Sequence, residues 1–305
     1  MNMQMKCIGR IDYACLELAQ EDTNMAFQRF NIWSLGCFFA AVAPLALAQA
    51  PAGETQGQAW VHTSESARGV IERAAVALPA RVTGGEVYFG KWKDAPTQVR
   101  ERVPVVVFMH GSSGLGLKAI GEWQQWLAAQ GIASVAPDSF ALPERLTYKS
   151  PVSADIYERV HALRLSEVAL AVRALVQAPW ADTSRWILAG TSEGAAAVAR
   201  YQGTEFAGRI VFSWSCENNY FVRSHDTALS PDKPVLNIIS ATDPYFSPAN
   251  NWLGNPAALG HCGAALRTHP RASIVLIPGA PHTVINMPAA RHPVAGFLRE
   301  VLQLP

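Results

Sequence analysis

The sequence predicts an α/β fold, with a mostly parallel central sheet and helices on both of its faces. Apolar runs of strand length alternate along the chain with periodic stretches of helix length. The strand runs are apolar throughout, as expected of parallel strands that are covered on both sides. The 305 residues suit one large domain. With 25 basic and 24 acidic side chains, the chain has no charge excess that would favour nucleic acid or an anionic membrane as a partner.

The N-terminal part is predicted to be a targeting segment rather than part of this fold. Residues 32–48 form an uncharged apolar run that follows Arg29 and ends in Ala46-Leu47-Ala48, a small-x-small pattern typical of signal-peptidase sites. We therefore interpret residues 1–48 as a signal peptide, which predicts a periplasmic or secreted protein without stable membrane insertion after cleavage. A membrane-spanning helix is the competing interpretation, but no basic stop-transfer cluster follows the run.

The start of translation and the start of the domain are separate questions. Met25 would give a signal of ordinary length, so the sequence leaves both Met1 and Met25 open as the first residue. Residues 49–80 begin with small and polar side chains and are predicted to be a flexible lead-in. The α/β domain is then expected to span residues 81–305.

The cysteine content predicts a disulfide. Of five cysteines, only Cys216 and Cys262 follow the predicted signal peptide. Two cysteines in an exported protein favour one bridge, here closing a span of 262 − 216 = 46 residues. In the chain-entropy description such a bridge contributes about 4 kcal/mol to stability. Two separate buried thiols are the alternative.

Strands are predicted where short apolar, β-branched runs end at a turn. The first is an edge strand or hairpin piece, and the others belong to the sheet interior. In chain order the expected strands are residues 82–89, 103–109, 132–136, 186–189, 209–214, 234–240 and 272–277.

Helices are predicted where apolar residues recur with helical spacing. Trp123, Trp126 and Leu127 have the i, i+3, i+4 spacing of one buried face, and Gly131 ends that stretch. Alanines give the run after residue 193 good helix propensity. The expected helices are residues 115–130, 154–177, the alanine-rich run and 293–302. Residues 141–153 and 244–263 are expected to be loops.

The segment from residue 186 to residue 200 carries the main functional signal. Its apolar run leads into Gly190-Thr191-Ser192-Glu193-Gly194, and the alanine-rich helix follows. A G-x-S-x-G sequence between a strand and a helix is the nucleophile elbow of α/β-hydrolases, in which the serine needs an unusual backbone angle and the glycines make room for it. Ser192 is therefore the predicted nucleophile, and a plain helix N-cap is the alternative.

Two later residues complete a predicted catalytic triad. In α/β-hydrolases the acid and the histidine follow the serine in that order, each just after a strand. Asp243 follows the strand that ends at Ser240, and His282 follows the strand that ends at Ile277. Alternatives stay open: Asp243 as a turn residue, and a surface role for His282. The rival acids are Glu217 and Asp226, and the rival histidines are His225, His261, His269 and His292.

Upstream residues are assigned supporting roles. The oxyanion hole is predicted to use the backbone N–H of Glu193, at the helix N-terminus, and that of Ser112 in the turn after the strand 103–109. The Glu193 side chain lines the pocket or pairs with a nearby base. His110 and Asp138 precede the elbow in the chain, so we interpret them as a loop-stabilising group and a cap. Trp214, at a strand end, is predicted to line the substrate pocket.

Together these motifs resemble the dienelactone hydrolase family of α/β-hydrolases. The resemblance covers roughly residues 80–303 and rests on five sequences: Met109-His-Gly-Ser-Ser-Gly-Leu115, Pro137-Asp-Ser-Phe140, Gly190-Thr-Ser-Glu-Gly194, Ala241-Thr-Asp243 and Gly279-Ala-Pro-His282. It implies the fold and a hydrolase of carboxylic esters or lactones, with a small-molecule substrate and neither a metal nor an organic cofactor. The namesake enzymes use a cysteine nucleophile and are typically not exported, so Ser192 and the predicted signal peptide suggest a more general esterase.

Two other functions fit the same residues. An acyltransferase on this scaffold would differ only in whether an alcohol or water takes the acyl group. A binding protein that has kept the fold would not use the triad at all, and fold alone does not decide function. The sequence gives neither the identity of the substrate nor the oligomeric state.

Overall fold

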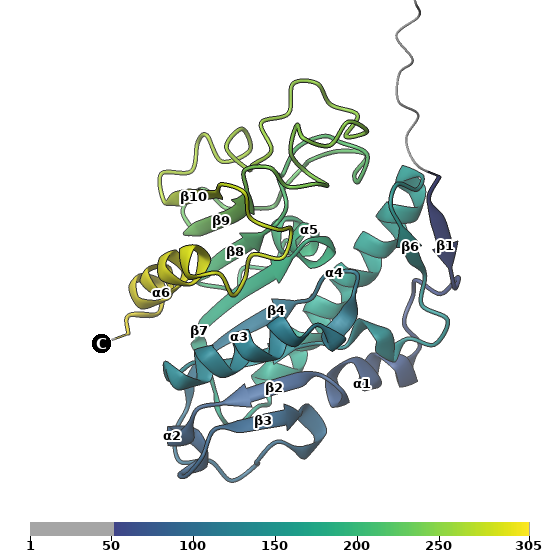
Figure 1. The fold of residues 1–305 in the computed structure, drawn as a ribbon. Helices are drawn as coiled ribbons and strands as arrows, with labels where there is room; N and C mark the ends of the chain where they lie inside the picture. Colours follow the sequence, from purple (N-terminus) through teal and green to yellow (C-terminus); the bar gives the residue numbers. More distant parts are fainter. Residues whose placement is uncertain (1–51, 305) are drawn as a thin grey trace, which may run out of the picture. The chain divides into compact units, whose positions relative to one another are not determined.

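The computed structural model describes residues 52–304, and its centre is an eight-stranded sheet (Figure 1). The strand order across the sheet is β10-β9-β8-β7-β4-β5-β2-β3. The strands are β2 (Ala75–Leu78), β3 (Tyr88–Lys91), β4 (Val103–Met109), β5 (Ala133–Ala136), β7 (Ala181–Thr191), β8 (Gly208–Phe212), β9 (Val235–Ser240) and β10 (Ala272–Ile277).

The six strands from β10 to β5 run parallel, and β2 and β3 add an antiparallel edge. The sheet is therefore mostly parallel, as predicted. The centre of the sheet is the β4–β7 pair, in which Met109 lies opposite Gly190. This register brings the loop that follows β4 and the predicted elbow that follows β7 to the same edge of the sheet.

Helices cover both faces of this sheet, which confirms the predicted fold class (Figure 1). One core cluster joins α3 and α6 to the sheet, and the other joins α4 and α5 to the opposite face. The helices are α1 (Ser64–Glu72), α2 (Ala80–Thr83), α3 (Lys118–Ala129), α4 (Ala154–Val176), α5 (Glu193–Arg200) and α6 (Pro288–Leu302). Short 3-10 helices span Trp92–Asp94, Gly114–Gly116 and Ser139–Ala141.

Strand β4 shows why its sequence is apolar without alternation. All seven of its residues are buried. Val105 and Val107 pack into the cluster with α4 and α5, whereas Val106 and Phe108 pack into the cluster with α3 and α6. Successive side chains of a strand point to opposite faces, so both faces of β4 lie in the core and every position is hydrophobic.

The segment predicted to be a flexible lead-in is instead structured, and this part of the prediction was wrong. Residues 52–80 contain α1 and also β2, which pairs with β5 inside the main sheet. They also contain β1 (Glu54–Gln56), which forms a separate two-stranded antiparallel sheet with β6 (Thr147–Lys149). The second half of this segment has buried apolar side chains at Val70, Ala74, Val76 and Leu78, whereas β1 is exposed and pairs with β6 through its backbone.

Several element boundaries also differ from the predictions; strand β7, for example, extends beyond the predicted residues 186–189 at both ends. The closing helix α6 begins at Pro288, before the predicted residue 293, because Pro288 occupies the first turn, where its missing N–H costs nothing. The stretch predicted as one strand over residues 82–89 divides into the end of α2 and the start of β3. Gly84 separates them in a left-handed conformation with φ 80°. Strand β3 is an edge strand, as expected.

The predicted signal peptide, residues 1–48, and the choice between Met1 and Met25 lie outside the described residues. Within residues 52–304, none of the helices has both the length and the apolar character needed to cross a membrane.

Candidate active site

Ser192 lies at a strained turn between β7 and α5. Its backbone has φ 54° and ψ −120°, a region that serine rarely adopts. The two flanking glycines allow this turn to approach its neighbours. A Cβ atom on Gly194 would lie 2.1 Å from the Met109 carbonyl oxygen, and one on Gly190 would lie 2.7 Å from the Gly194 carbonyl oxygen. The G-x-S-x-G spacing therefore has a steric reason in this fold: no larger residue fits at either position.

His282 and Asp243 meet beside this turn. Asp243 follows β9, His282 follows β10, and the two strands are parallel neighbours. The His282 Nδ1 atom lies 2.7 Å from the Asp243 Oδ2 atom. The other carboxylate oxygen of Asp243 accepts the backbone N–H groups of Tyr245 and Phe246. Asp243 is fully buried, so its carboxylate has a fixed orientation. Because a carboxylate oxygen can only accept, the His282 Nδ1 atom beside it carries the hydrogen.

Ser192 and His282 line one cleft of about 430 Å³ at the carboxyl edge of the sheet. This is where parallel α/β sheets build their sites. The other lining residues come from the loop after β4, from β6 and its continuation, and from the loops after β8 and β9. They include Gly111, Ser112, Ser113, Tyr148, Lys149, Ser150, Tyr220, Phe221, Tyr245 and Phe246.

The two predicted oxyanion donors lie in this region. Glu193 is the first residue of α5, a position whose backbone N–H has no partner within the helix. Ser112 lines the cleft in the loop after β4, and this loop approaches the elbow closely: a Cβ atom on Gly111 would lie 3.4 Å from the Ser192 Cβ atom. The structure thus brings five of the predicted catalytic and binding residues to one edge of the sheet: Ser112, Ser192, Glu193, Asp243 and His282. Their roles remain predictions.

Solved structures with a similar fold include a protein from Klebsiella pneumoniae subsp. pneumoniae MGH 78578 that is provisionally described as a dienelactone hydrolase. It has a TM-score of 0.50 and 15% identity over 75% of this chain and 99% of that one. The chain has the α/β-hydrolase fold. A more distant likeness is an esterase from Pyrobaculum calidifontis, with a TM-score of 0.46 and 15% identity over 78% of this chain and 87% of that one. Another is the dienelactone hydrolase-like promiscuous phosphotriesterase P91 from metagenomic libraries, with a TM-score of 0.48 and 17% identity over 76% of this chain and 98% of that one. No protein-family model matches the sequence, and no curated protein does.

Trp214 does not line the cleft, which corrects its predicted role. Strand β8 ends at Phe212, and the Trp214 side chain turns into the core, where it is fully buried. The aromatic lining comes instead from Tyr148 on the short strand β6 and from loop residues that strand periodicity could not place: Tyr220, Phe221, Tyr245 and Phe246. The local signal for two of them was their position directly after Asp243-Pro244.

The rival acids are occupied elsewhere. Both carboxylate oxygens of Glu217 accept backbone N–H groups, from Leu259 at 2.7 Å and from Gly260 at 2.9 Å. Asp226 is exposed and accepts the Ser224 hydroxyl. None of the four rival histidines lines the cleft with Ser192: His225, His261, His269 and His292.

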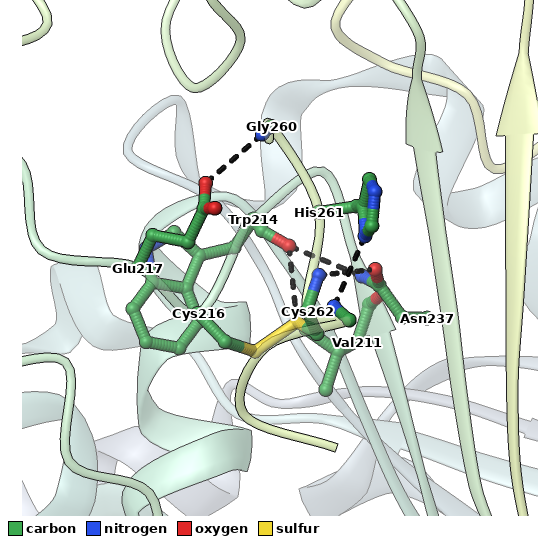
Figure 2. Close-up of a disulfide and its surroundings, with 9 residues drawn as sticks. Val211, Trp214, Cys216, Glu217, Asn237, Gly260, His261 and Cys262 are labelled. Atoms are coloured by element: carbon green, nitrogen blue, oxygen red, sulfur yellow. Dashed lines mark hydrogen bonds between the residues drawn. A yellow bond between two sulfur atoms is a disulfide. The ribbon is translucent and has the colours of Figure 1, made fainter. Parts of the chain in front are cut away.

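The predicted disulfide between Cys216 and Cys262 is confirmed (Figure 2). It joins the segment after β8 to the long loop that precedes β10, and both cysteines are fully buried. Glu217 fastens the same two segments through its bonds to residues 259 and 260. Asn237 on β9 supports the pair by accepting the Cys262 N–H and donating to the Trp214 carbonyl. Together these contacts fix the base of the loops that carry Tyr220 and Phe221 into the cleft.

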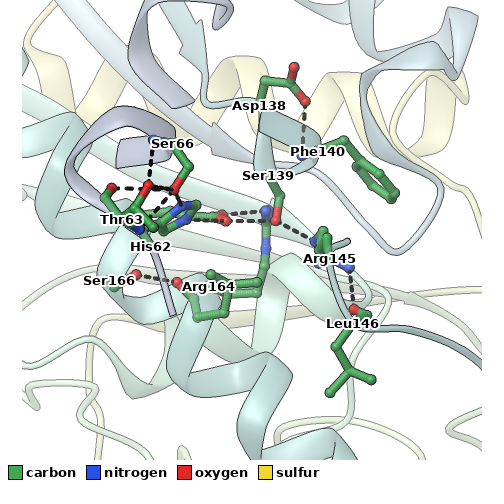
Figure 3. Close-up of polar contacts among 12 residues, drawn as sticks. His62, Thr63, Ser66, Asp138, Ser139, Phe140, Arg145, Leu146, Arg164 and Ser166 are labelled. Atoms are coloured by element: carbon green, nitrogen blue, oxygen red, sulfur yellow. Dashed lines mark hydrogen bonds and ion pairs between the residues drawn. The ribbon is translucent and has the colours of Figure 1, made fainter. Parts of the chain in front are cut away.

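A buried polar cluster includes Ser139, Arg145 and Arg164 (Figure 3). The Ser139 hydroxyl donates to Glu167 at 2.6 Å and accepts from the Arg145 Nε atom at 2.7 Å. Arg164 pairs with Glu167 and donates to the His110 carbonyl at 2.9 Å. Burial alone would raise the pKa of Glu167, but the Arg164 charge and the hydrogen bonds from His62 and Ser139 hold that pKa at about 2.

His110 and Asp138 have the supporting roles assigned to them from the sequence. The His110 Nε2 atom accepts the Ser139 N–H, so its Nδ1 carries the hydrogen and donates to the Gly111 carbonyl at 2.7 Å. Burial, and next the charge of Arg164, lower the pKa of His110 well below its usual range, which keeps the ring neutral. Asp138 caps the following 3-10 helix by accepting the Phe140 N–H.

Within the described residues, no group of three or more histidine, cysteine, aspartate or glutamate side chains is arranged to hold a metal ion. The expectation that the protein uses neither a metal nor an organic cofactor stays a prediction.

Proposed function

We propose that this protein is a serine hydrolase that cleaves carboxylic esters or lactones through an acyl-enzyme. One observation carries the proposal: a serine on a strained strand-to-helix turn shares a cleft with a histidine that is held by a buried carboxylate. A nucleophile, a base and a group that orients the base are the three parts that serine catalysis needs.

The proposed reaction has two halves. The Ser192 Oγ atom attacks the ester carbonyl while His282 Nε2 accepts its proton, because Nδ1 is engaged by Asp243. The oxyanion that forms is stabilised by the backbone N–H groups of Glu193 and Ser112. His282 then donates the proton to the leaving alkoxide, so the alcohol departs and an acyl-enzyme remains. Water, deprotonated by His282, attacks the acyl-enzyme and releases the acid, and Ser192 regains its proton.

The lining of the cleft favours uncharged substrates. Tyrosine and phenylalanine side chains line it at five positions, and Lys149 is the one lysine, arginine, aspartate or glutamate among the described lining residues. That lysine is already paired with Glu54, 2.8 Å away. A cleft of this kind favours small esters with apolar or aromatic groups over anionic substrates.

An active-site label tests the proposal directly. A fluorophosphonate reacts with an activated serine and forms a stable adduct, so we expect one adduct per chain, on the peptide that contains Ser192. Prior incubation with p-nitrophenyl acetate should slow the labelling, and labelled protein should lose its esterase activity. Mass spectrometry of the digested protein identifies the site. An adduct on another serine, or none on protein that hydrolyses the ester, would contradict the proposal.

We also propose that the protein is exported and cleaved after Ala48. The disulfide supports this proposal, because such bridges persist mainly in oxidising compartments. Expression in a bacterial host with a periplasm should give a periplasmic product whose N-terminal residue is Gln49, as measured by intact mass and N-terminal sequencing. Product that stays in the cytoplasm with an uncleaved N-terminus would rule out this proposal.

A further inference from the structure

Four charged side chains are buried beside the elbow: Arg145, Arg164, Glu167 and Glu193. None has more than 2% of its side chain exposed. Burying a charge is costly unless it is closely paired, and breaking one partner of a buried pair is more costly still. The four side chains carry two positive and two negative charges, so the cluster is neutral as a whole. Any substitution that removes one charge leaves a buried net charge next to the nucleophile.

Arg145 is the main partner of Glu193 in this cluster. Its Nη2 atom donates to the Glu193 Oε1 atom at 2.6 Å, its Nε to the Ser139 hydroxyl and its Nη1 to the Leu146 carbonyl. The second carboxylate oxygen, Glu193 Oε2, has no hydrogen-bond partner among the described residues. Arg164 stands 3.5 Å from Glu193 Oε1 and makes the second ion pair. The shortest contact that holds the Glu193 side chain is therefore the one to the Arg145 guanidinium group.

The same cluster reaches both proposed oxyanion donors. Glu193 carries one donor on its own backbone. Arg164 donates to the carbonyl of His110, two residues before Ser112, which carries the other. Arg164 thus joins the N-terminus of α5 to the loop after β4, and Arg145 also holds Glu193; both side chains are buried. Oxyanion donors act by being held in place before the charge develops, so a rigid support of this kind has a direct catalytic use.

The charge of Glu193 poses a second requirement. A carboxylate on the residue that donates to the oxyanion repels the negative charge that develops there, and this repulsion is strong where water is excluded. The charge already affects the cleft: burial first, and the charge of Glu193 second, raise the pKa of the lining residue Tyr148 well above its usual range. The positive charge of Arg145 opposes this rise in the pKa of Tyr148.

We propose that Arg145 is a positioning residue for the oxyanion site, which fixes the first turn of α5 through Glu193 and cancels the charge of that carboxylate. This inference rests on the proposed function, because it assumes that the Glu193 N–H binds an oxyanion. Arg145 does not touch the substrate and acts through Glu193.

The N-terminal segment holds Arg145 in place. The carbonyl of Glu144 accepts the N–H groups of Gln58 and Ala59, and the N–H of Leu146 donates to the Ala59 carbonyl. Gly57 passes so close that a Cβ atom there would lie 2.4 Å from the Arg145 carbonyl oxygen. Further along, β1 pairs with β6, which carries Tyr148 to the cleft. The N-terminal segment, which was predicted to be flexible, therefore anchors the part of the chain that carries Arg145 and Tyr148.

The test compares Arg145→Met, Glu193→Gln and the double variant R145M/E193Q with the wild type. Arg145→Met leaves the cluster with one excess negative charge, so we expect kcat for p-nitrophenyl acetate to fall about 10- to 100-fold, less than for complete loss of an oxyanion donor, with KM nearly unchanged. Glu193→Gln removes the opposing charge and should lower kcat only a few-fold. The double variant is neutral again, so we expect its kcat to be about tenfold higher than that of Arg145→Met. A role of Arg145 that does not pass through Glu193 predicts instead that the two losses add.

A transition-state analogue provides a second readout. An aryl trifluoromethyl ketone adds to Ser192 reversibly and forms an oxyanion, so its Ki should rise in Arg145→Met by the factor by which kcat/KM falls. If Arg145→Met does not fold, Arg145→Lys serves the same purpose. It keeps the charge, but its single nitrogen cannot reach the three acceptors that three nitrogen atoms of Arg145 contact, and we expect about a three- to tenfold loss of kcat/KM with a matching rise in Ki.

Arg200→Met is the matched control. Arg200 also lies on α5 and pairs with Glu158 at 2.7 Å, but it contacts neither Glu193 nor the cleft. This variant should lower the melting temperature and leave kcat unchanged. A folded Arg145 variant with wild-type kcat/KM and Ki overturns the inference, as does a double variant no faster than Arg145→Met. Ser192→Ala distinguishes failure of the proposed function from failure of this inference. If esterase activity is retained in Ser192→Ala, both are overturned. If activity depends on Ser192 but is the same in the Arg145 variants as in the wild type, only this inference is overturned.

Discussion

Replacing Ser192 by alanine is expected to lower kcat for p-nitrophenyl acetate by about 10⁴-fold or more, as in other serine hydrolases that lose their nucleophile. The change removes one oxygen atom and leaves the backbone turn as it is. Neither the two glycines that flank the turn nor the packing of α5 is altered. We therefore expect the melting temperature to stay within a few degrees of the wild type, so that lost activity reports on chemistry. Initial rates over a range of ester concentrations provide the measurement.

Ser192→Cys is the informative companion to this variant. It keeps a nucleophilic atom at the same turn, so we expect slow ester hydrolysis and labelling by thiol reagents in place of fluorophosphonate. The substrate cleft should be intact in both variants, and a competitive product inhibitor should bind each as it binds the wild type. Equal hydrolysis by the wild type and Ser192→Ala would place the nucleophile elsewhere and remove the assignment.

The sequence was sufficient to predict the parallel strands of the central sheet, although not β2, because both faces of the inner strands are buried. A continuous apolar run such as that of β4 has few other uses, and its predicted bounds agree with the structure. The G-x-S-x-G turn was equally recognisable, because steric contact excludes any side chain at Gly190 and Gly194. Asp243 and His282 followed from their order in the chain and their positions at strand ends.

The errors lie where contacts distant in the chain decide the structure. Nothing in the sequence near β1 indicates that it pairs with β6, about 90 residues later, because this pairing uses the backbone. Trp214 was placed in the cleft from its position at a strand end, but the neighbouring disulfide and Asn237 turn that segment into the core. The burial of the Arg145–Glu193 pair could likewise not be predicted from the hydrophobic pattern, since a single arginine in a predicted loop is usually exposed.

Replacing Asp243 by asparagine is expected to lower kcat by about 10⁴-fold, because it changes which ring nitrogen of His282 carries the hydrogen. In the wild type, a carboxylate oxygen of Asp243 lies 2.7 Å from His282 Nδ1, which holds the hydrogen there and leaves Nε2 free to accept the serine proton. Asparagine can still accept the N–H groups of Tyr245 and Phe246 through its amide oxygen, which directs its NH₂ group at Nδ1. The ring must then carry its hydrogen on Nε2, where it cannot act as a base.

The fold should tolerate this change, because asparagine has the shape of aspartate and keeps both backbone contacts. Glu217→Gln is the matched control: Glu217 is the other buried carboxylate that follows a strand near the site, and it binds only the backbone of residues 259 and 260. We expect that variant to lower the melting temperature while kcat stays at the wild-type value. The opposite pattern, with full activity in Asp243→Asn and a large loss in Glu217→Gln, would transfer the role of the acid to Glu217. The pair of variants thus decides which buried carboxylate orients the histidine, because each removes one negative charge and only one of the two adjoins an imidazole.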